Sequence, residues 1–290
     1  MKQKITFLFL LTTTFLSAQI SYKGFIDKYP IEFVSEVYSD GVGSGVYAYT
    51  NYDTPISLSA KLKGKTLVFT EKDKNNKETA KLSFENYNAK SSQLNGIWKD
   101  LNSGKELTIR LTKEFDLEKA YDMEGKEREI LQSVSFKDKY FKLIISKDKE
   151  SSYASVSGVK IFEKKTDKLI QKFYVECQLL GIGNISIDDY NFDGIPDFSV
   201  YEGGTAGPDS TSLYFLYNPK TGKYFESSFS GSSLEFDSKN KRIYEHNQCC
   251  AGTSVTEAEY KVVNNKMVLL KQNCFKLDIK LGKLKKVKCN

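Results

Sequence analysis

The sequence predicts an all-β protein made of many short antiparallel strands. Its 18 tyrosines and 19 phenylalanines, set against only 5 prolines, favour strands over helices. Many short runs are rich in Tyr, Phe, Val, Ile and Thr, whereas few stretches repeat with the period of a helix. Turn-forming residues separate these runs at nearly even spacing, which is typical of antiparallel sheets.

The chain opens with the layout of a secretory signal peptide. Two lysines precede an apolar run over residues 5–16, and Ser17 and Ala18 offer small residues for cleavage before Gln19. The run is shorter than the roughly 20 residues that span a bilayer. We expect residues 1–18 to be a signal peptide and the mature protein to be periplasmic or secreted, without a transmembrane segment. A retained membrane anchor is the alternative.

Residues 19–113 are expected to form an N-terminal β-meander domain. Seven strand-like runs follow one another there, separated by turns. An antiparallel meander of this length protects its edges by curling into a small barrel or a strongly bent sheet. The expected strands are residues 31–38, 44–50, 56–62, 66–71, 80–87, 94–100 and 106–112.

Residues 114–130 interrupt this pattern, and residues 131–290 return to it. The interruption is charged and contains good helix formers, which favours a linker or a short helix. In the second part, Asn264 and Asn265 suit the positive φ of a tight hairpin turn. The expected strands are residues 140–146, 153–163, 169–176, 184–189, 197–202, 212–218, 223–229, 242–247, 255–263 and 266–272.

The charge pattern argues against a nucleic-acid-binding protein. The formal charge of +6 falls to about +4 without Lys2 and Lys4, which is too mild for that class. The C-terminal tail is locally basic, and its alternation predicts an edge strand guarded by lysines. A patch for an anionic partner is the alternative. These lysines are Lys276, Lys280, Lys283, Lys285, Lys286 and Lys288.

The cysteines indicate disulfides without fixing their pairing. An exported chain favours disulfides, but an odd number leaves at least one free thiol. The neighbours Cys249 and Cys250 are expected to bridge to other strands more easily than to each other, because the small ring between them strains its peptide bond. A zinc site is a weaker alternative, since the usual paired spacing of ligands is absent and the only histidine, His246, has no second histidine at ligand spacing. The five are Cys177, Cys249, Cys250, Cys274 and Cys289.

The sequence predicts a protein that is not an enzyme. A single histidine makes histidine-based catalysis hard to build, and no G-x-S-x-G elbow or phosphate-binding glycine loop is present. A glycosidase that uses a carboxylate pair is the alternative.

An acidic loop, "DDYNFDGIPDF", matches the first nine positions of a calcium loop. Counted from Asp189 as position one, oxygen-bearing side chains occupy positions one, three, five and nine. Gly194 occupies the sharp bend at position six, and position seven offers a carbonyl oxygen. Val200 replaces the glutamate of an EF-hand at position twelve, and both flanks are strand-like, so an EF-hand is excluded. A structural Ca²⁺ ion is expected, with a solvated acidic turn as the alternative. The expected ligands are Asp189, Asn191, Asp193, Ile195 and Asp197.

The order of motifs in residues 136–270 resembles a known family. A strand "LIQKFYVE" precedes the "D-x-N-F-D-G-x-x-D" loop, an aromatic strand ends in "YNPKTGKYF", and a late hairpin carries "EYKVVNNK". This half of the chain resembles bacterial exported proteins related to the periplasmic inhibitors of invertebrate-type lysozyme, a group that includes immunity proteins against wall-degrading effectors. The resemblance implies a propeller-like β domain with a bound calcium ion.

The resemblance also implies a partner. Such inhibitors present an "S-G-x-x-Y" loop to the enzyme, and three segments here approach that pattern, at residues 44–47, 157–161 and 230–234. The expected function is an exported, non-catalytic binding protein that inhibits a lysozyme-like wall-degrading enzyme or acts as an immunity protein. The alternative is a calcium-stabilised structural or adhesive module of the cell exterior, with cell-wall glycan as its partner.

Overall fold

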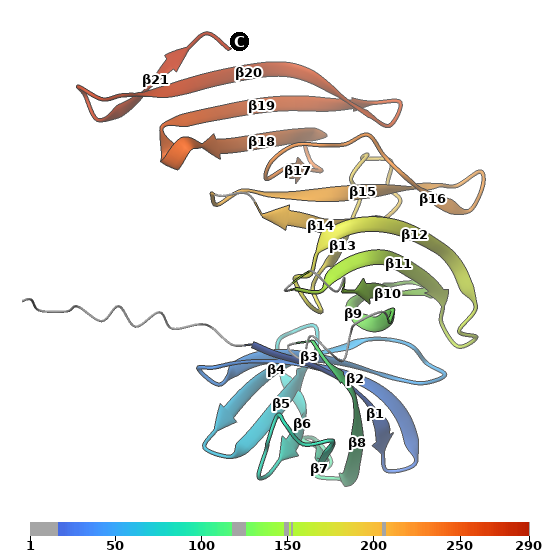
Figure 1. Cartoon of the computed structure of the whole chain (residues 1–290). Coiled ribbons are helices and arrows are strands. Elements are labelled where there is room, and N and C mark those ends of the chain that lie inside the picture. The colour runs from blue at the N-terminus through green and yellow to red at the C-terminus, as the bar shows by residue number, and fades with distance from the viewer. Residues whose placement is uncertain (1–16, 118–125, 148–150, 152, 205–206, 290) are drawn as a thin grey trace, which may run out of the picture.

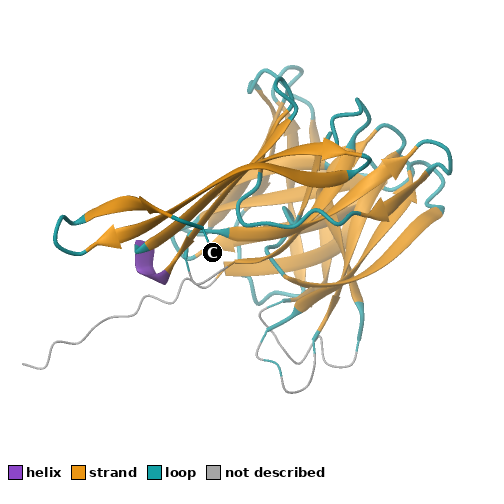
Figure 2. Ribbon diagram, turned by 90° about the horizontal axis from the view of Figure 1, so that it is seen from above, coloured by secondary structure: helices purple, strands orange, loops and turns teal. Residues whose placement is uncertain are grey.

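The computed structural model describes residues 17–117, 126–147, 151, 153–204 and 207–289. The all-β prediction is confirmed: a closed barrel is followed by three further sheets, which succeed one another away from the barrel (Figure 1). In the described part of the chain the one helical segment labelled is a 3-10 turn, Cys250–Gly252 (Figure 2). Most of the expected signal peptide, residues 1–16, lies outside the described residues. None of the helices described is long and apolar enough to cross a membrane.

The N-terminal meander is an eight-stranded closed barrel, with one strand more than the sequence predicts. The additional strand, β1, pairs with both β2 and β8 and thereby closes the barrel. Gly24 allows the close approach to β8, because a Cβ atom there would lie 2.0 Å from the carbonyl oxygen of Arg110. The strands are β1 (Ser17–Ile26), β2 (Tyr29–Tyr38), β3 (Val42–Tyr49), β4 (Ile56–Lys63), β5 (Thr66–Lys72), β6 (Glu78–Phe84), β7 (Gln93–Asp100) and β8 (Glu106–Asp116).

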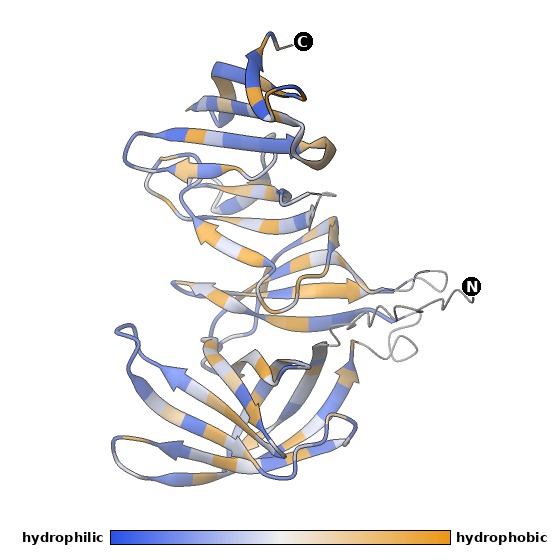
Figure 3. Cartoon of the chain, turned by 90° about the vertical axis from the view of Figure 1, so that its left-hand side faces the viewer, coloured by the Kyte–Doolittle hydropathy of each residue, from blue (hydrophilic) through white to orange (hydrophobic). Residues whose placement is uncertain are grey.

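Alternating apolar residues fill the barrel interior, as Figure 3 shows along the strands. Phe33, Phe69 and Phe84 are fully buried there, and the rings of Phe33 and Phe69 meet edge to face at 5.1 Å. The interior is therefore a packed core, and no ligand cavity is required to explain its residues.

Three antiparallel meanders form the rest of the fold. Each consists of strands consecutive in the chain, as in a propeller blade, which agrees with the propeller-like prediction. The first sheet contains β9 (Arg128–Phe136), β10 (Lys139–Ser146), β11 (Ser155–Glu163) and β12 (Leu169–Gln178). The second contains β13 (Ile185–Asp188), β14 (Asp197–Gly204), β15 (Ser210–Asn218) and β16 (Lys223–Glu226). The third contains β17 (Glu235–Asp237), β18 (Arg242–Cys249), β19 (Ser254–Val263), β20 (Lys266–Asp278) and β21 (Lys283–Val287).

Strands occupy both ends of the segment expected as a linker or helix over residues 114–130. β8 continues through Asp116, and β9, which the sequence analysis missed, begins at Arg128. Residues 118–125, where a helix would have to lie, are outside the described residues. The expected hairpin turn is confirmed at Asn264 and Asn265, whose φ angles are +51° and +59°.

The barrel and the first sheet share one hydrophobic core. Val34 and Val46, on the outer side of the barrel, belong to the same buried cluster as Leu131 and Phe141 of the first sheet. A salt bridge between Lys142 and Glu32, 2.8 Å long, crosses the same boundary. The N-terminal barrel is thus packed directly against the first sheet.

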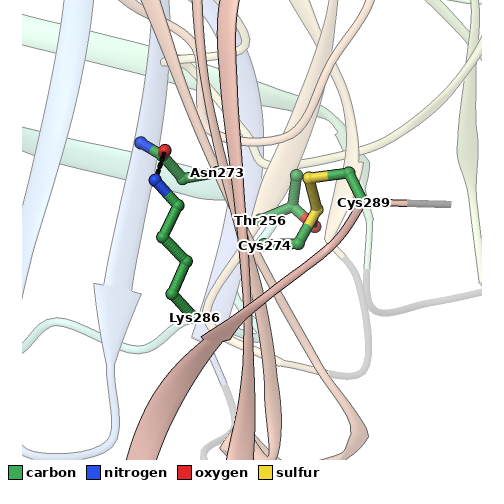
Figure 4. The surroundings of a disulfide bond; sticks show 5 residues. All are labelled: Thr256, Asn273, Cys274, Lys286 and Cys289. Atoms are coloured by element: carbon green, nitrogen blue, oxygen red, sulfur yellow. Dashed lines mark hydrogen bonds between the residues drawn. A yellow bond between two sulfur atoms is a disulfide. The ribbon is translucent and has the colours of Figure 1, made fainter.

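The basic tail is an edge strand, as its alternation predicts. β21 is the outermost strand of the third sheet and pairs only with β20 among the described strands. A disulfide between Cys274 and Cys289 fastens its end to β20, with 5.3 Å between the Cα atoms (Figure 4). Lys286 also donates a hydrogen bond of 2.7 Å to the side-chain oxygen of Asn273. The bridge selects one of the pairings that the sequence leaves open.

Cys177 is expected to resist alkylation in the folded protein. It is buried, and burial raises the pKa of its thiol to about 12, so at pH ~8 only about one part in 10⁴ is thiolate. Under reducing conditions, iodoacetamide should leave the tryptic fragment 173–220 unmodified while it labels Cys249 and Cys250, which are free and exposed. In denaturant all three should react. Labelling of Cys177 in the native protein at the rate of the exposed thiols would contradict its burial.

Candidate metal centre

The acidic loop joins β13 to β14 where the second and third sheets meet. Tyr190 and Phe192 are buried in a core cluster, and Asn191 between them is also buried, whereas Asp193 and Gly194 at the tip of the turn are exposed. The ring of Tyr190 lies 4.7 Å from that of Phe236 and 5.0 Å from that of Tyr214. Two buried aromatic side chains therefore anchor the loop in the hydrophobic cluster between the second and third sheets. The sequence analysis named the oxygen ligands and missed these anchors.

Backbone N–H groups hold the first three oxygen-bearing side chains in a tight turn. The two carboxylate oxygens of Asp189 accept from the N–H groups of Asp193 and Gly194, at 3.0 and 2.7 Å. The amide oxygen of Asn191 accepts from Asp193 at 3.1 Å, and Asp193 accepts from Ile195 at 2.8 Å. The φ of Gly194 is +86°, which suits glycine at the sharp bend. The oxygens of loop positions one, three and five consequently face the same turn.

Asp197, the ninth loop position, is buried at the base of the turn. Its side chain is 1% exposed, and its two oxygens accept from the backbone N–H groups of Tyr190 at 3.0 Å and Tyr217 at 2.8 Å. Burial raises the pKa of Asp197 to about 7, although these two hydrogen bonds act in the opposite direction. This carboxyl therefore ties the loop to β15 and lies where a positive charge would favour its ionised form.

The loop is also tied to the third sheet. Asn191 donates from its amide nitrogen to the side-chain oxygen of Asn265 in the β19–β20 turn, at 3.0 Å. Lys241 donates to the carbonyl oxygen of Phe192 at 3.1 Å. Residues far apart in the sequence thus meet at this loop. A change in the conformation of the loop would therefore disturb the hydrogen bonds that join the second sheet to the third.

The donor set suits a hard cation. The side chains supply carboxylate and amide oxygens, which Ca²⁺ prefers, and an oxygen that accepts one N–H keeps a lone pair for another partner. Within the described ranges, no three His, Cys, Asp or Glu side chains gather closely enough to hold a metal ion. The carboxylates of Asp189, Asp193 and Asp197 therefore do not form a metal-binding cluster by themselves. A calcium ion here would also need the amide oxygen of Asn191 and the carbonyl oxygen of Ile195. Val200, at loop position twelve, is a fully buried residue of β14.

Two of the three segments that approach the inhibitor pattern are strands. Residues 44–47 lie in β3 and residues 157–161 in β11, and each of these strands is paired on both sides. Only residues 230–234 lie in a loop, between β16 and β17. There the N–H of Ser232 donates to Glu245 at 3.0 Å and the hydroxyl of Ser233 donates to Asp209 at 3.1 Å.

Comparisons with known proteins do not assign the chain to a family. No family model matches it, and no curated protein matches it. A structure described as a Xanthomonas type IV secretion system related protein shares 12% identity, with 94% of this chain and 99% of that chain covered and a TM-score of 0.26. A porin-like protein from Bacteroides uniformis shares 9% identity over 90% and 95% of the two chains, with a TM-score of 0.21. The β-propeller domain of the Trilobed protease from Pyrococcus furiosus shares 12% identity over 96% and 85%, with a TM-score of 0.23. Similarity of this degree does not establish a common function.

Proposed function

We propose that the chain is an exported, non-catalytic binding protein whose acidic loop holds a structural Ca²⁺ ion. The observation that carries the proposal is the position of the loop. It is anchored in a core by Tyr190 and Phe192, joined to β15 by Asp197, and joined to the third sheet by Asn191. An ion held at such a junction stabilises the ends of strands and does not need an open coordination position for a substrate.

Five residues would supply the ligands. Asp189 and Asp193 offer carboxylate oxygens, and the buried Asp197 offers another. Asn191 adds an amide oxygen, and Ile195 adds its carbonyl oxygen. These oxygen ligands match a divalent hard cation better than a soft one. Binding would have to draw the three carboxylates together, because they do not form a metal-sized cluster in the part of the chain that the structure describes.

A lysozyme-like wall-degrading enzyme is the partner that we propose. The resemblance of residues 136–270 to lysozyme inhibitors motivates this choice, and residues 230–234 are the one inhibitor-like segment that the fold leaves in a loop. Leu234 stands where the inhibitor pattern has tyrosine. Cell-wall glycan is the alternative partner, in which case the protein would be an adhesive module.

The partner can be tested with a panel of lysozymes that includes the invertebrate type. We expect at least one to be inhibited and to co-elute with the protein at micromolar concentration, which requires about −8 kcal/mol of binding free energy. The double variant Ser232→Ala plus Ser233→Ala should weaken inhibition by about tenfold if this loop enters the cleft. Absence of inhibition and co-elution with every enzyme would remove the inhibitor proposal. Binding to isolated cell wall alone would favour the adhesive module, and release of peptidoglycan fragments would refute the non-catalytic assignment.

A further inference from the structure

Two neighbouring cysteines end the β18–β19 hairpin in an uncommon backbone conformation. β18 ends at Cys249, and the connecting turn places Cys250, Ala251 and Gly252 at φ angles of +60°, +54° and +81°. L-residues rarely adopt this left-handed region, and here two occur in succession. Thr253 holds the turn, because its hydroxyl donates to the carbonyl oxygen of Cys250 at 2.7 Å.

This turn brings the two thiols together. Successive side chains of a strand point to opposite faces, yet the sulfur atoms of Cys249 and Cys250 lie only 2.8 Å apart. That separation is shorter than an ordinary non-bonded contact between sulfur atoms. Both residues are exposed, so small reagents can reach the pair.

The other cysteines do not compete for these thiols. Cys274 is bonded to Cys289, and Cys177 is buried with a thiol whose pKa is raised to about 12. The expectation that Cys249 and Cys250 bridge to other strands therefore has no support in the structure. Cys249 and Cys250 are therefore each other's nearest sulfur partner among the described residues.

The surroundings give a reagent room to approach. A hollow of about 500 Å³ borders the pair and is lined by residues 207–208, Ser232 and the turn itself. A hydrogen bond shared with the sulfur of Cys249 raises the pKa of the Cys250 thiol, so Cys250 holds its proton more tightly than an ordinary thiol does. The attacking group in thiol–disulfide exchange is a thiolate, which disfavours Cys250 as the first nucleophile.

We propose that Cys249 and Cys250 are a redox-active pair that alternates between a dithiol and a vicinal disulfide by exchange with small disulfides and thiols. In the oxidising direction, the Cys249 thiolate attacks one sulfur of an external disulfide, which releases one external thiolate and leaves a mixed disulfide on Cys249. The Cys250 thiolate, after losing its proton to solvent, then attacks the Cys249 sulfur and releases the second external thiol. The pair loses two electrons and two protons, and the external disulfide is reduced to two thiols.

The experiment equilibrates the full chain with glutathione and glutathione disulfide at graded ratios. Samples are quenched with acid, labelled with a maleimide in denaturant and digested with trypsin. The fragment covering residues 243–261 contains only these two cysteines, so its mass reports the pair directly. We expect this fragment to pass from two labels to none as the ratio of glutathione disulfide to glutathione rises. Fragment 173–220, which contains Cys177, should keep its label throughout.

Matched variants separate pairing from simple oxidation. Cys249→Ser and Cys250→Ser each leave one thiol, which should accumulate a glutathione adduct and never reach the unlabelled, adduct-free state. Cys177→Ser should leave the transition of the pair unchanged. Fragment 243–261 carrying two labels at every ratio, or two glutathione adducts in the unmodified chain, would overturn the proposal. So would disulfide-linked dimers as the main oxidised product.

Discussion

Phe198→Ala is expected to lower the free energy of unfolding by about 3–5 kcal/mol. Phe198 is fully buried in β14, immediately after the last carboxylate of the acidic loop. Its ring stacks on that of Phe215 at 4.6 Å and meets those of Tyr224 and Phe141 at 5.0 and 5.3 Å. Removing the ring leaves a cavity that surrounding aromatic side chains cannot fill, and it also removes the favourable ring contacts.

Chemical denaturation with a structural probe of the second sheet measures this loss. Phe198→Leu should cost less, because it keeps much of the apolar volume. Phe25→Ala is the matched control: Phe25 is 46% exposed on the barrel, and its loss should change the free energy of unfolding by no more than about 0.5 kcal/mol. Equal effects of Phe198→Ala and Phe25→Ala would contradict the packing described around Phe198.

Local patterns are sufficient to predict most strands and the turn that connects β19 to β20. Alternation and turn chemistry placed the runs in residues 31–112, and the Asn264–Asn265 turn was recognised because its residues tolerate positive φ. β1 was missed because it follows the apolar run of the expected signal peptide without a turn signal. β9 was missed because its start is charged and helix-forming, and only its pairing with β10 makes it a strand.

The acidic turn could be predicted from the sequence, whereas the contacts that support it could not. Spacing alone singles out Asp189, Asn191, Asp193 and Asp197 as candidate ligands, because the ligands of a calcium loop are close in sequence. The contacts with Asn265 and Lys241 depend on how two sheets pack, and no local pattern encodes them. The cysteines behave likewise, since the Cys274–Cys289 bridge depends on the pairing of β20 with β21.

Calcium is expected to raise the melting temperature of the transition that includes the second and third sheets. An ion that binds only the folded state, at about a hundredfold excess over its dissociation constant, adds roughly 2.7 kcal/mol. For a chain of this size that corresponds to about 5–10 °C. The double variant Asp189→Asn plus Asp193→Asn should lose this rise. Asparagine keeps one acceptor oxygen at each position, which serves the N–H groups of Gly194 and Ile195. Only the second acceptor at position 189, for the N–H of Asp193, is lost together with the two negative charges.

The control must remove two comparable carboxylates from turns that lack the calcium pattern. Asp73 and Asp100 each accept backbone N–H groups in barrel turns, so Asp73→Asn plus Asp100→Asn should retain the full response to calcium. Scanning calorimetry in excess calcium and in chelator, with titration calorimetry for the ion itself, distinguishes the outcomes. Chelator should bring the unmodified protein down to the melting temperature of the loop variant. If the unmodified protein melts at the same temperature in both solutions and binds no ion, the hydrogen bonds of Asp189, Asp193 and Asp197 alone hold this turn, and the proposed calcium centre is refuted.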